Sequence, residues 1–173
     1  MPLYEFEGKR PVIADDAFVH DQAVLIGDVE IGSSCYIAAC SVLRGDFGRI
    51  VVGPGSNVQD GCVVHSFPGE TVVLGPDSHI AHGAILHGGK LGRHAVIGMN
   101  AVVLDFAELG DDCVIASGAV VPAHSKVPAR TLMVGIPAKP VRELKADELD
   151  KWMGATRAYQ ELARSSLATL KRI

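Results

Sequence analysis

Residues 13–43 read IADDAFVHDQAVLIGDVEIGSSCYIAACSVL, and every sixth residue of this stretch, starting with the first, is aliphatic. The same spacing continues to Val127, interrupted by three extra residues before Val52 and four before Leu74, and shortened to five before Leu91. Every position in phase is Ile, Leu or Val. So long a series at a fixed period indicates a repeat architecture rather than an ordinary globular core.

Small residues follow the same period. The fourth residue after each aliphatic is usually Ala, Ser or Cys, and the residue directly after the aliphatic is often Gly. This pattern predicts a short strand and a tight turn every six residues, with one large and one small side chain per unit in a narrow core. Three units would close a triangular coil, giving a parallel β-helix of about six coils. The left-handed sense is taken from the resemblance to hexapeptide-repeat proteins, because the period alone gives no hand.

The repeat gives way to a second kind of pattern near the C-terminus. We expect residues 1–140 to form the β-helix and residues 141–173 to form a helix that begins after Arg142. Acidic residues near position 147 suit a helix N-terminus. Apolar residues then recur at helical spacing and need a surface to pack on, either the solenoid or a neighbouring subunit.

Composition excludes several classes of function. The chain of 173 residues has a net charge of −4 and no long run of one sign, so no nucleic-acid partner is expected. No apolar stretch is long enough for a membrane span or a signal peptide, which predicts a cytoplasmic protein with no membrane partner. The four cysteines lack CxxC spacing and predict neither a zinc cluster nor a disulfide framework.

The register of the repeat sorts the seven histidines. Counting coils places Arg44, His65 and His87 in one outward slot on successive coils, and Asp60 and His82 in another on the preceding face. Three neutral imidazoles with an open fourth position make a catalytic zinc site. An unliganded surface ladder of histidines is the alternative.

The three histidines are expected on two different faces, and this limits how one metal site could form from them. Outward side chains on different faces diverge, so the three histidines would be gathered only if a neighbouring copy supplied one of them. That arrangement predicts a homotrimer closed around a threefold axis, with metal sites at its interfaces. The remaining histidines are not assigned to the site: they are His20, His79, His94 and His124, with His79 expected at a corner.

These residues carry a resemblance to a known family. The motifs Arg44-Gly45-Asp46 and Asn57-Val58-Gln59-Asp60, together with the three histidines, resemble the pattern of the γ-class carbonic anhydrases over roughly residues 10–140. Residues 43–52 and 84–88 are most similar to its PaaY/CaiE-like branch, named for phenylacetate degradation and carnitine metabolism. That branch overlaps with proteins labelled ferripyochelin-binding.

The resemblance implies a role for each residue. His65, His82 and His87 would bind Zn²⁺, or else Fe²⁺ or Co²⁺, at the interface of the trimer. Arg44 and Asp46 would form an ion pair between subunits, Gln59 would orient the metal-bound water, and Asp60 would support it. Tyr159 matches a helix tyrosine that reaches toward the site.

The implied activity is the reversible hydration of CO₂ to bicarbonate by metal-bound hydroxide. Three alternatives stay open: hydrolysis of CoA thioesters by the same centre, acyl transfer as in hexapeptide-repeat acyltransferases, and metal binding without catalysis. The turn at residues 135–139 fits the acyltransferases, but they use a lone histidine. The sequence departs from the γ-class prototype at the acidic residues tied to proton export. Phe47 stands where the prototype has Glu, and the loop at residues 66–70 has Glu70 as its one carboxylate.

Overall fold

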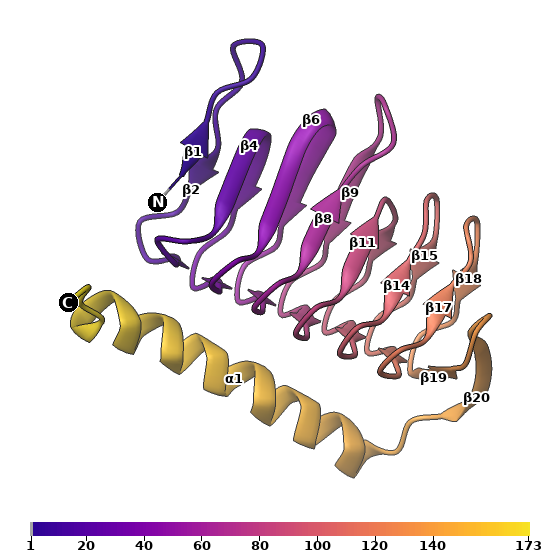
Figure 1. Cartoon of the computed structure of the whole chain (residues 1–173). Coiled ribbons are helices and arrows are strands. Elements are labelled where there is room, and N and C mark those ends of the chain that lie inside the picture. Colours follow the sequence, from indigo (N-terminus) through magenta and orange to yellow (C-terminus); the bar gives the residue numbers. More distant parts are fainter. Residues whose placement is uncertain (1) are drawn as a thin grey trace.

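The computed structural model describes residues 2–173, which form a left-handed parallel β-helix with one long helix along its side (Figure 1). Each coil contributes a short strand to each of three faces. The face beneath the long helix, here called the helix face, contains the following strands: β3 (Phe18–Val19), β5 (Tyr36–Ile37), β7 (Asn57–Val58), β10 (His79–Ile80), β13 (Val96–Ile97), β16 (Val114–Ile115), β19 (Thr131–Val134) and β20 (Lys139–Glu143).

The other two faces belong to one continuous sheet, because β4 (Val24–Ile31) and β6 (Val42–Val52) each bend across the corner between them. The first halves of these strands lie on the face that carries His65 and His87, here called the histidine face. Its other strands are β1 (Leu3–Tyr4), β8 (Val63–His65), β11 (Ile85–His87), β14 (Val102–Val103) and β17 (Val120–Val121). Their second halves lie on the third face, with β2 (Val12–Ile13), β9 (Thr71–Leu74), β12 (Lys90–Leu91), β15 (Glu108–Leu109) and β18 (Lys126–Val127).

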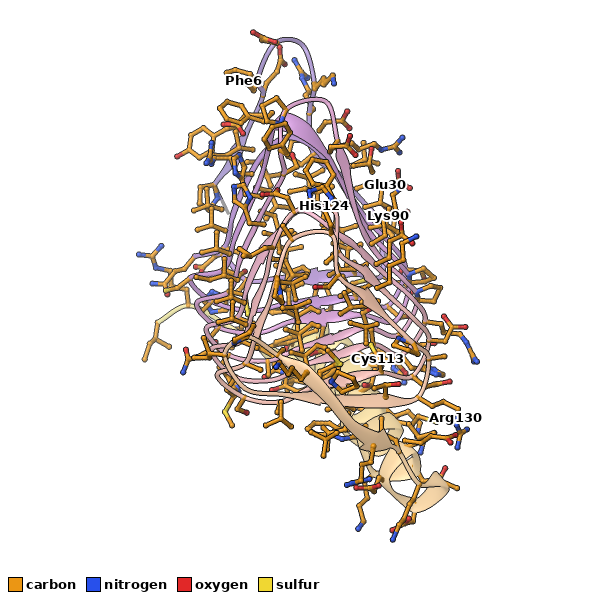
Figure 2. The ribbon with its side chains drawn as sticks, turned by 90° about the vertical axis from the view of Figure 1, so that its right-hand side faces the viewer. Phe6, Glu30, Lys90, Cys113, His124 and Arg130 are labelled. Carbon is orange, nitrogen blue, oxygen red and sulfur yellow. The ribbon has the colours of Figure 1, made fainter. Side chains whose placement is uncertain are left out.

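The core is the stack of repeat positions. All aliphatic residues in phase are buried except Ile13 and Val19, which lie at the open N-terminal end and are only partly covered. Three of the four cysteines occupy the small slot and are buried, as expected of small apolar side chains. Figure 2 shows the labelled side chains in relation to the coils, with Glu30 and Lys90 on the same side of the solenoid.

The interruptions of the period share one place in the fold. The extra residues before Val52, the extra residues before Leu74 and the shortened step before Leu91 all fall at the corner where the histidine face meets the third face. This corner directly follows the slot of Arg44, His65 and His87. The irregular part of the sequence therefore surrounds the candidate site.

Helix α1 (Ala146–Thr169) lies along the helix face of its own solenoid and contacts β3, β5 and β7 (Figure 1). It begins later than expected, because the chain after Arg142 is still extended: β20 pairs antiparallel with β19 through Glu143. Both terminal guanidinium nitrogens of Arg142 donate to Glu148 in the first helical turn, each at 2.7 Å. Within residues 2–173, no helix combines the length and hydropathy that crossing a membrane requires.

Candidate metal centre

Arg44, His65 and His87 lie on successive coils of the histidine face, as the register predicts. Their Cα atoms are paired across β6, β8 and β11. The two imidazoles meet edge to face, with ring centroids 5.1 Å apart. Nδ1 of His65 lies 3.2 Å from Nε2 of His87, so the two rings present nitrogens to each other.

A carboxylate holds the far nitrogen of each ring. Asp46 Oδ1 lies 3.0 Å from Nε2 of His65, and Asp105 Oδ1 lies 2.9 Å from Nδ1 of His87. A neutral imidazole has one N–H, and a carboxylate can only accept it. The two nitrogens that face each other are therefore both lone pairs, an arrangement that is repulsive unless a cation lies between them.

This donor set fits a divalent metal ion. Two nitrogens bound at 2.0–2.1 Å to one tetrahedral ion are about 3.3 Å apart, close to the separation found here. Carboxylates behind the ligating histidines are the usual outer partners of such a site. Asp105 was missed by the sequence reasoning, although it lies 18 residues after His87, which is one coil of the solenoid.

Arg44 completes this cluster. Its Nη1 donates to Asp46 Oδ2 at 2.6 Å within the chain, and the expected pairing between subunits stays a prediction. Burial works to raise the pKa of Asp46, but hydrogen bonds from Arg44 and His65 outweigh it and hold that pKa below its ordinary value. Burial lowers the pKa of His65, although the hydrogen bond to Asp46 acts in the opposite direction. The lowered pKa favours the neutral imidazole, which is the form that binds a metal.

Glycine is required inside the Arg44-Gly45-Asp46 motif. A Cβ on Gly45 would lie 2.4 Å from the carbonyl oxygen of Asp28, because β4 and β6 approach closely where both strands bend. A larger residue would push the strands apart. The motif therefore places two charged side chains on either side of a close backbone contact.

His82 lies apart from the pair. It is half-exposed, and its Nδ1 is 2.9 Å from Asp60 Oδ2 on the coil below, as the register predicts. In the part of the chain that is described, no three His, Cys, Asp or Glu side chains gather closely enough to hold an ion by themselves. His82 lies in the turn between β10 and β11, at the corner between the helix face and the histidine face, and not on the preceding face as expected. One chain thus offers two facing imidazoles and a third at this corner.

Gln59 lies beneath α1, and Tyr159 is a residue of α1 that faces the same buried cluster; neither contacts the histidine pair. Gln59 is 2% exposed, and its Nε2 contacts Asn57 Oδ1 at 2.9 Å and His79 Nε2 at 2.8 Å. The ring of Tyr159 packs against Tyr36 and His79, each with centroids 5.5 Å apart. Their roles in a reaction stay predictions.

The expected corner position of His79 is wrong. His79 lies within β10, in register with Asn57 of β7, and points outward under α1. Burial there lowers its pKa to about 4. The residue directly before each aliphatic of this face fills the same outward slot, so counting could have placed it in the strand.

A cavity of about 90 Å³ lies at the interrupted corner, and one of its walls is Asp105, the hydrogen-bond partner of His87. Its walls include Phe67, Phe106, the Gly88-Gly89 backbone and Asp105, together with other charged residues. The two phenyl rings contact each other with centroids 5.5 Å apart. A third exposed ring, that of Phe47, lies 5.2 Å from the ring of His65. Small apolar groups therefore have a place to bind next to the candidate centre.

Comparison with known proteins assigns the chain to a family. The carnitine operon protein CaiE of Salmonella agona is 45% identical over 94% of this chain and 82% of its own length. CaiE of Escherichia coli K12 is 44% identical over 94% and 83%. This chain belongs to the CaiE family. The crystal structure of a hexapeptide transferase family protein from Anaplasma phagocytophilum is also similar, with a TM-score of 0.91 and 34% identity over 95% of this chain and 97% of that one.

The repeat pattern described as bacterial transferase hexapeptide (six repeats) matches residues 10–45 and 88–123 of this CaiE-family chain. The segment between the matches contains both insertions and His65, His82 and His87. The departures from the general repeat are thus concentrated at the candidate centre, while the matched coils form the scaffold on either side.

Proposed function

We propose that this CaiE-family protein is a γ-carbonic anhydrase-like metalloenzyme that hydrates CO₂ reversibly to bicarbonate. His65 and His87 of one chain, with the partner subunit's His82, would hold Zn²⁺, Fe²⁺ or Co²⁺. One observation carries the proposal: a ring nitrogen of His65 faces one of His87 at 3.2 Å, and a carboxylate holds the other nitrogen of each ring.

When bound, such an ion lowers the pKa of a coordinated water to about 7 and so supplies a nucleophile at neutral pH. The chain's own residues would orient the metal ligands and attract the product. Asp46 and Asp105 fix the tautomer and direction of the two imidazoles. Asp60 does the same for His82. The Arg44 guanidinium beside the pair attracts the anionic product and offsets the charge of Asp46.

An apolar strip on the histidine face supports the homotrimer. Its members are outward-facing, β-branched and paired in register from coil to coil: Val24, Val42, Val63, Ile85, Val102 and Val120. The strip runs beside the slot of the two histidines, and its central members are the most exposed. A second copy covering this strip would bury it and could bring its own His82 to the centre.

Hydrolysis of a CoA thioester is the second candidate, and the corner cavity favours it. CO₂ needs no apolar pocket, whereas an acyl group does. The cavity of about 90 Å³ beside the candidate centre offers such a pocket. Acyl transfer by a lone histidine is less well supported, because the ladder presents two facing imidazoles with separate carboxylate partners.

One sample tests the proposal. Protein purified anaerobically should contain about one divalent ion per chain, and its CO₂ hydration should disappear on chelation and return when the ion is restored. Butyryl-CoA hydrolysis measured on the same sample decides the second candidate. Hydration that survives complete removal of metal would overturn the proposed centre. Bound metal with neither activity would assign the chain to the metal-binding proteins.

A further inference from the structure

The corner cavity exists because one coil of the solenoid is shorter than its neighbours. The step that ends at Leu91 has five residues instead of six, and the coil before it carries the extra loop at residues 66–70. Gly88 and Gly89 fill the short step, and both have positive φ. A Cβ on Gly88 would lie 2.8 Å from Oδ1 of Asp105, so this part of the cavity wall requires glycine.

Two phenyl rings from the neighbouring coils form the aromatic part of the cavity wall. Phe67 comes from the loop before the short step and Phe106 from the turn after it. Their centroids are 5.5 Å apart, and the ring planes are inclined by 56°. His124 stacks on Phe106 with centroids 4.8 Å apart, which holds that ring in place. The cavity therefore offers two aromatic surfaces to a small ligand.

The charged side chains of the wall carry more negative than positive charge. Three carboxylates and one ammonium group line the cavity: Glu70, Asp105, Glu108 and Lys90. Lys126 approaches Glu108 at 3.9 Å and offsets part of its charge. Among residues 2–173, Glu70 forms no ion pair, and Asp105 pairs only with His87. A cavity with this excess of negative charge attracts cations.

The aromatic rings and the carboxylates together select the kind of cation. An ammonium group with N–H bonds is strongly hydrated and needs hydrogen-bond acceptors around it. A cation whose nitrogen carries methyl groups presents an apolar surface and is attracted to a ring face within about 6 Å. Within the described residues, no three acidic, histidine or cysteine side chains could hold a metal ion at this place. The cavity therefore suits a methylated ammonium better than a metal ion or a free amine.

We propose that the corner cavity binds a methylated ammonium cation, whose methyl groups contact Phe67 and Phe106 and whose charge lies near Glu70. Lys90 opposes this binding and limits its strength. The site is separate from the candidate metal centre, although Asp105 belongs to both, and the binding depends on neither proposed activity. An uncharged acyl group, which thioester hydrolysis would place in this cavity, is the competing occupant.

Choline and 3,3-dimethylbutan-1-ol have the same shape, but only choline carries a charge. The chain has five phenylalanines, so ¹³C-labelled phenyl rings give a spectrum simple enough to assign. Choline should shift the signals of Phe67 and Phe106 and leave those of Phe6 and Phe18 in place. It should bind about fivefold more tightly than the alcohol, as expected of a cation close to aromatic rings. Unmoved signals of Phe67 and Phe106, or equal or tighter binding of the alcohol, would overturn the proposal.

A matched pair of variants tests the charge of Glu70. Glu70→Gln should weaken choline binding about threefold, within the range of one partly exposed ion pair, and leave binding of the alcohol unchanged. Glu161→Gln removes the same charge from the exposed surface of α1 and should change neither affinity. Lys90→Met removes the cation of the wall and should tighten choline binding by a similar factor. An unchanged choline affinity in Glu70→Gln, or a weakened one in Lys90→Met, would refute the charge contact.

Phe106→Leu retains an apolar side chain but removes the ring. It should weaken choline binding about fivefold and binding of the alcohol much less, because only the cation is attracted to the ring face. Phe6→Leu is the control, since Phe6 is similarly exposed and does not line the cavity. Phe67→Leu takes the place of Phe106→Leu if circular dichroism shows that the latter disturbs the coil. Equal losses for choline and the alcohol, or no loss for either, would overturn the proposal.

Discussion

Nδ1 of His65 and Nε2 of His87 lie 3.2 Å apart on adjacent coils, with a carboxylate behind each ring. The pair comes from a single chain, so part of the candidate centre is formed before any assembly. A third ligand must then come from elsewhere, because His82 lies in the turn between β10 and β11, and no three His, Cys, Asp or Glu side chains of the described residues form a site together.

Removal of any one ligand should empty the centre. We expect His65→Ala, His82→Ala and His87→Ala each to lose most bound metal, as measured by plasma mass spectrometry after dialysis. All three should stay folded by circular dichroism, since the core is the aliphatic stack.

His94→Ala and His124→Ala are the controls. His94 is held between Asp77 and Asp112, and His124 stacks on Phe106, so neither belongs to the facing pair. Both should keep full occupancy. Full occupancy in His82→Ala would instead mean that the third ligand is another residue.

A charge in the apolar strip should separate the subunits. Ile85, 39% exposed, lies at the middle of the strip, and lysine there would be buried without a partner at a cost of several kcal/mol. Sedimentation equilibrium should give three chains for the parent and one for Ile85→Lys, with metal lost in parallel. Val12→Lys, on the third face and 64% exposed in the parent, should remain trimeric. A monomer that retains its metal would refute the shared centre.

CO₂ hydration should be limited by proton export. The ring of Phe47 lies against His65 and faces solvent, and Glu70 is the one acid of the neighbouring loop. Stopped-flow rates should therefore rise with buffer concentration, since a buffer molecule replaces the missing side chain. Phe47→Glu should raise the rate several-fold at low buffer. Thioester hydrolysis, being slower, should show little buffer dependence, and fast hydration insensitive to buffer would contradict this account.

The corner cavity should set the length of any acyl group. Phe106→Ala enlarges it and should shift the ratio of kcat/KM for octanoyl-CoA over butyryl-CoA about tenfold, the low end of what one methylene is worth in a hydrophobic pocket. Phe6→Ala is the matched control: Phe6 is 40% and Phe106 38% exposed, and Phe6, in the N-terminal hairpin (Figure 2), does not line the cavity. An unchanged ratio in Phe106→Ala would exclude the cavity as an acyl site.

Acid should destabilise the fold through His79. Its pKa of about 4 in the folded chain lies below the value near 6.5 in the unfolded chain, so the unfolded state binds more protons between these values. This contribution to stability is complete above pH 6.5 and falls as the pH drops toward 4. Urea unfolding should lose about 2 kcal/mol from this group between pH 7.5 and 5. His79→Gln should remove that part of the pH dependence, and an equal loss in the variant would contradict the assignment.

The fold could be predicted from the spacing because each step of six residues is one core position. The same counting places His65 above Arg44 and His87 above His65. It would also have placed Asp105, had it been carried one coil further. The burial of His79 could not be predicted, because the period gives its outward direction but not which face α1 covers. The start of α1 was missed because pairing with β19, a contact distant in sequence, keeps β20 extended.

The reversed direction of β20 determines where the solenoid ends. A stack of parallel coils presents open hydrogen-bonding edges, onto which a coil of another molecule could add. At the C-terminal edge of the helix face, β20 runs antiparallel, contains Pro140 without an N–H, and exposes charged side chains. A parallel coil approaching this edge finds neither the right strand direction nor a full set of donors. The C-terminal edge of the helix face is therefore a poor template for the addition of a coil from another molecule, whereas the other two faces end on β17 and β18.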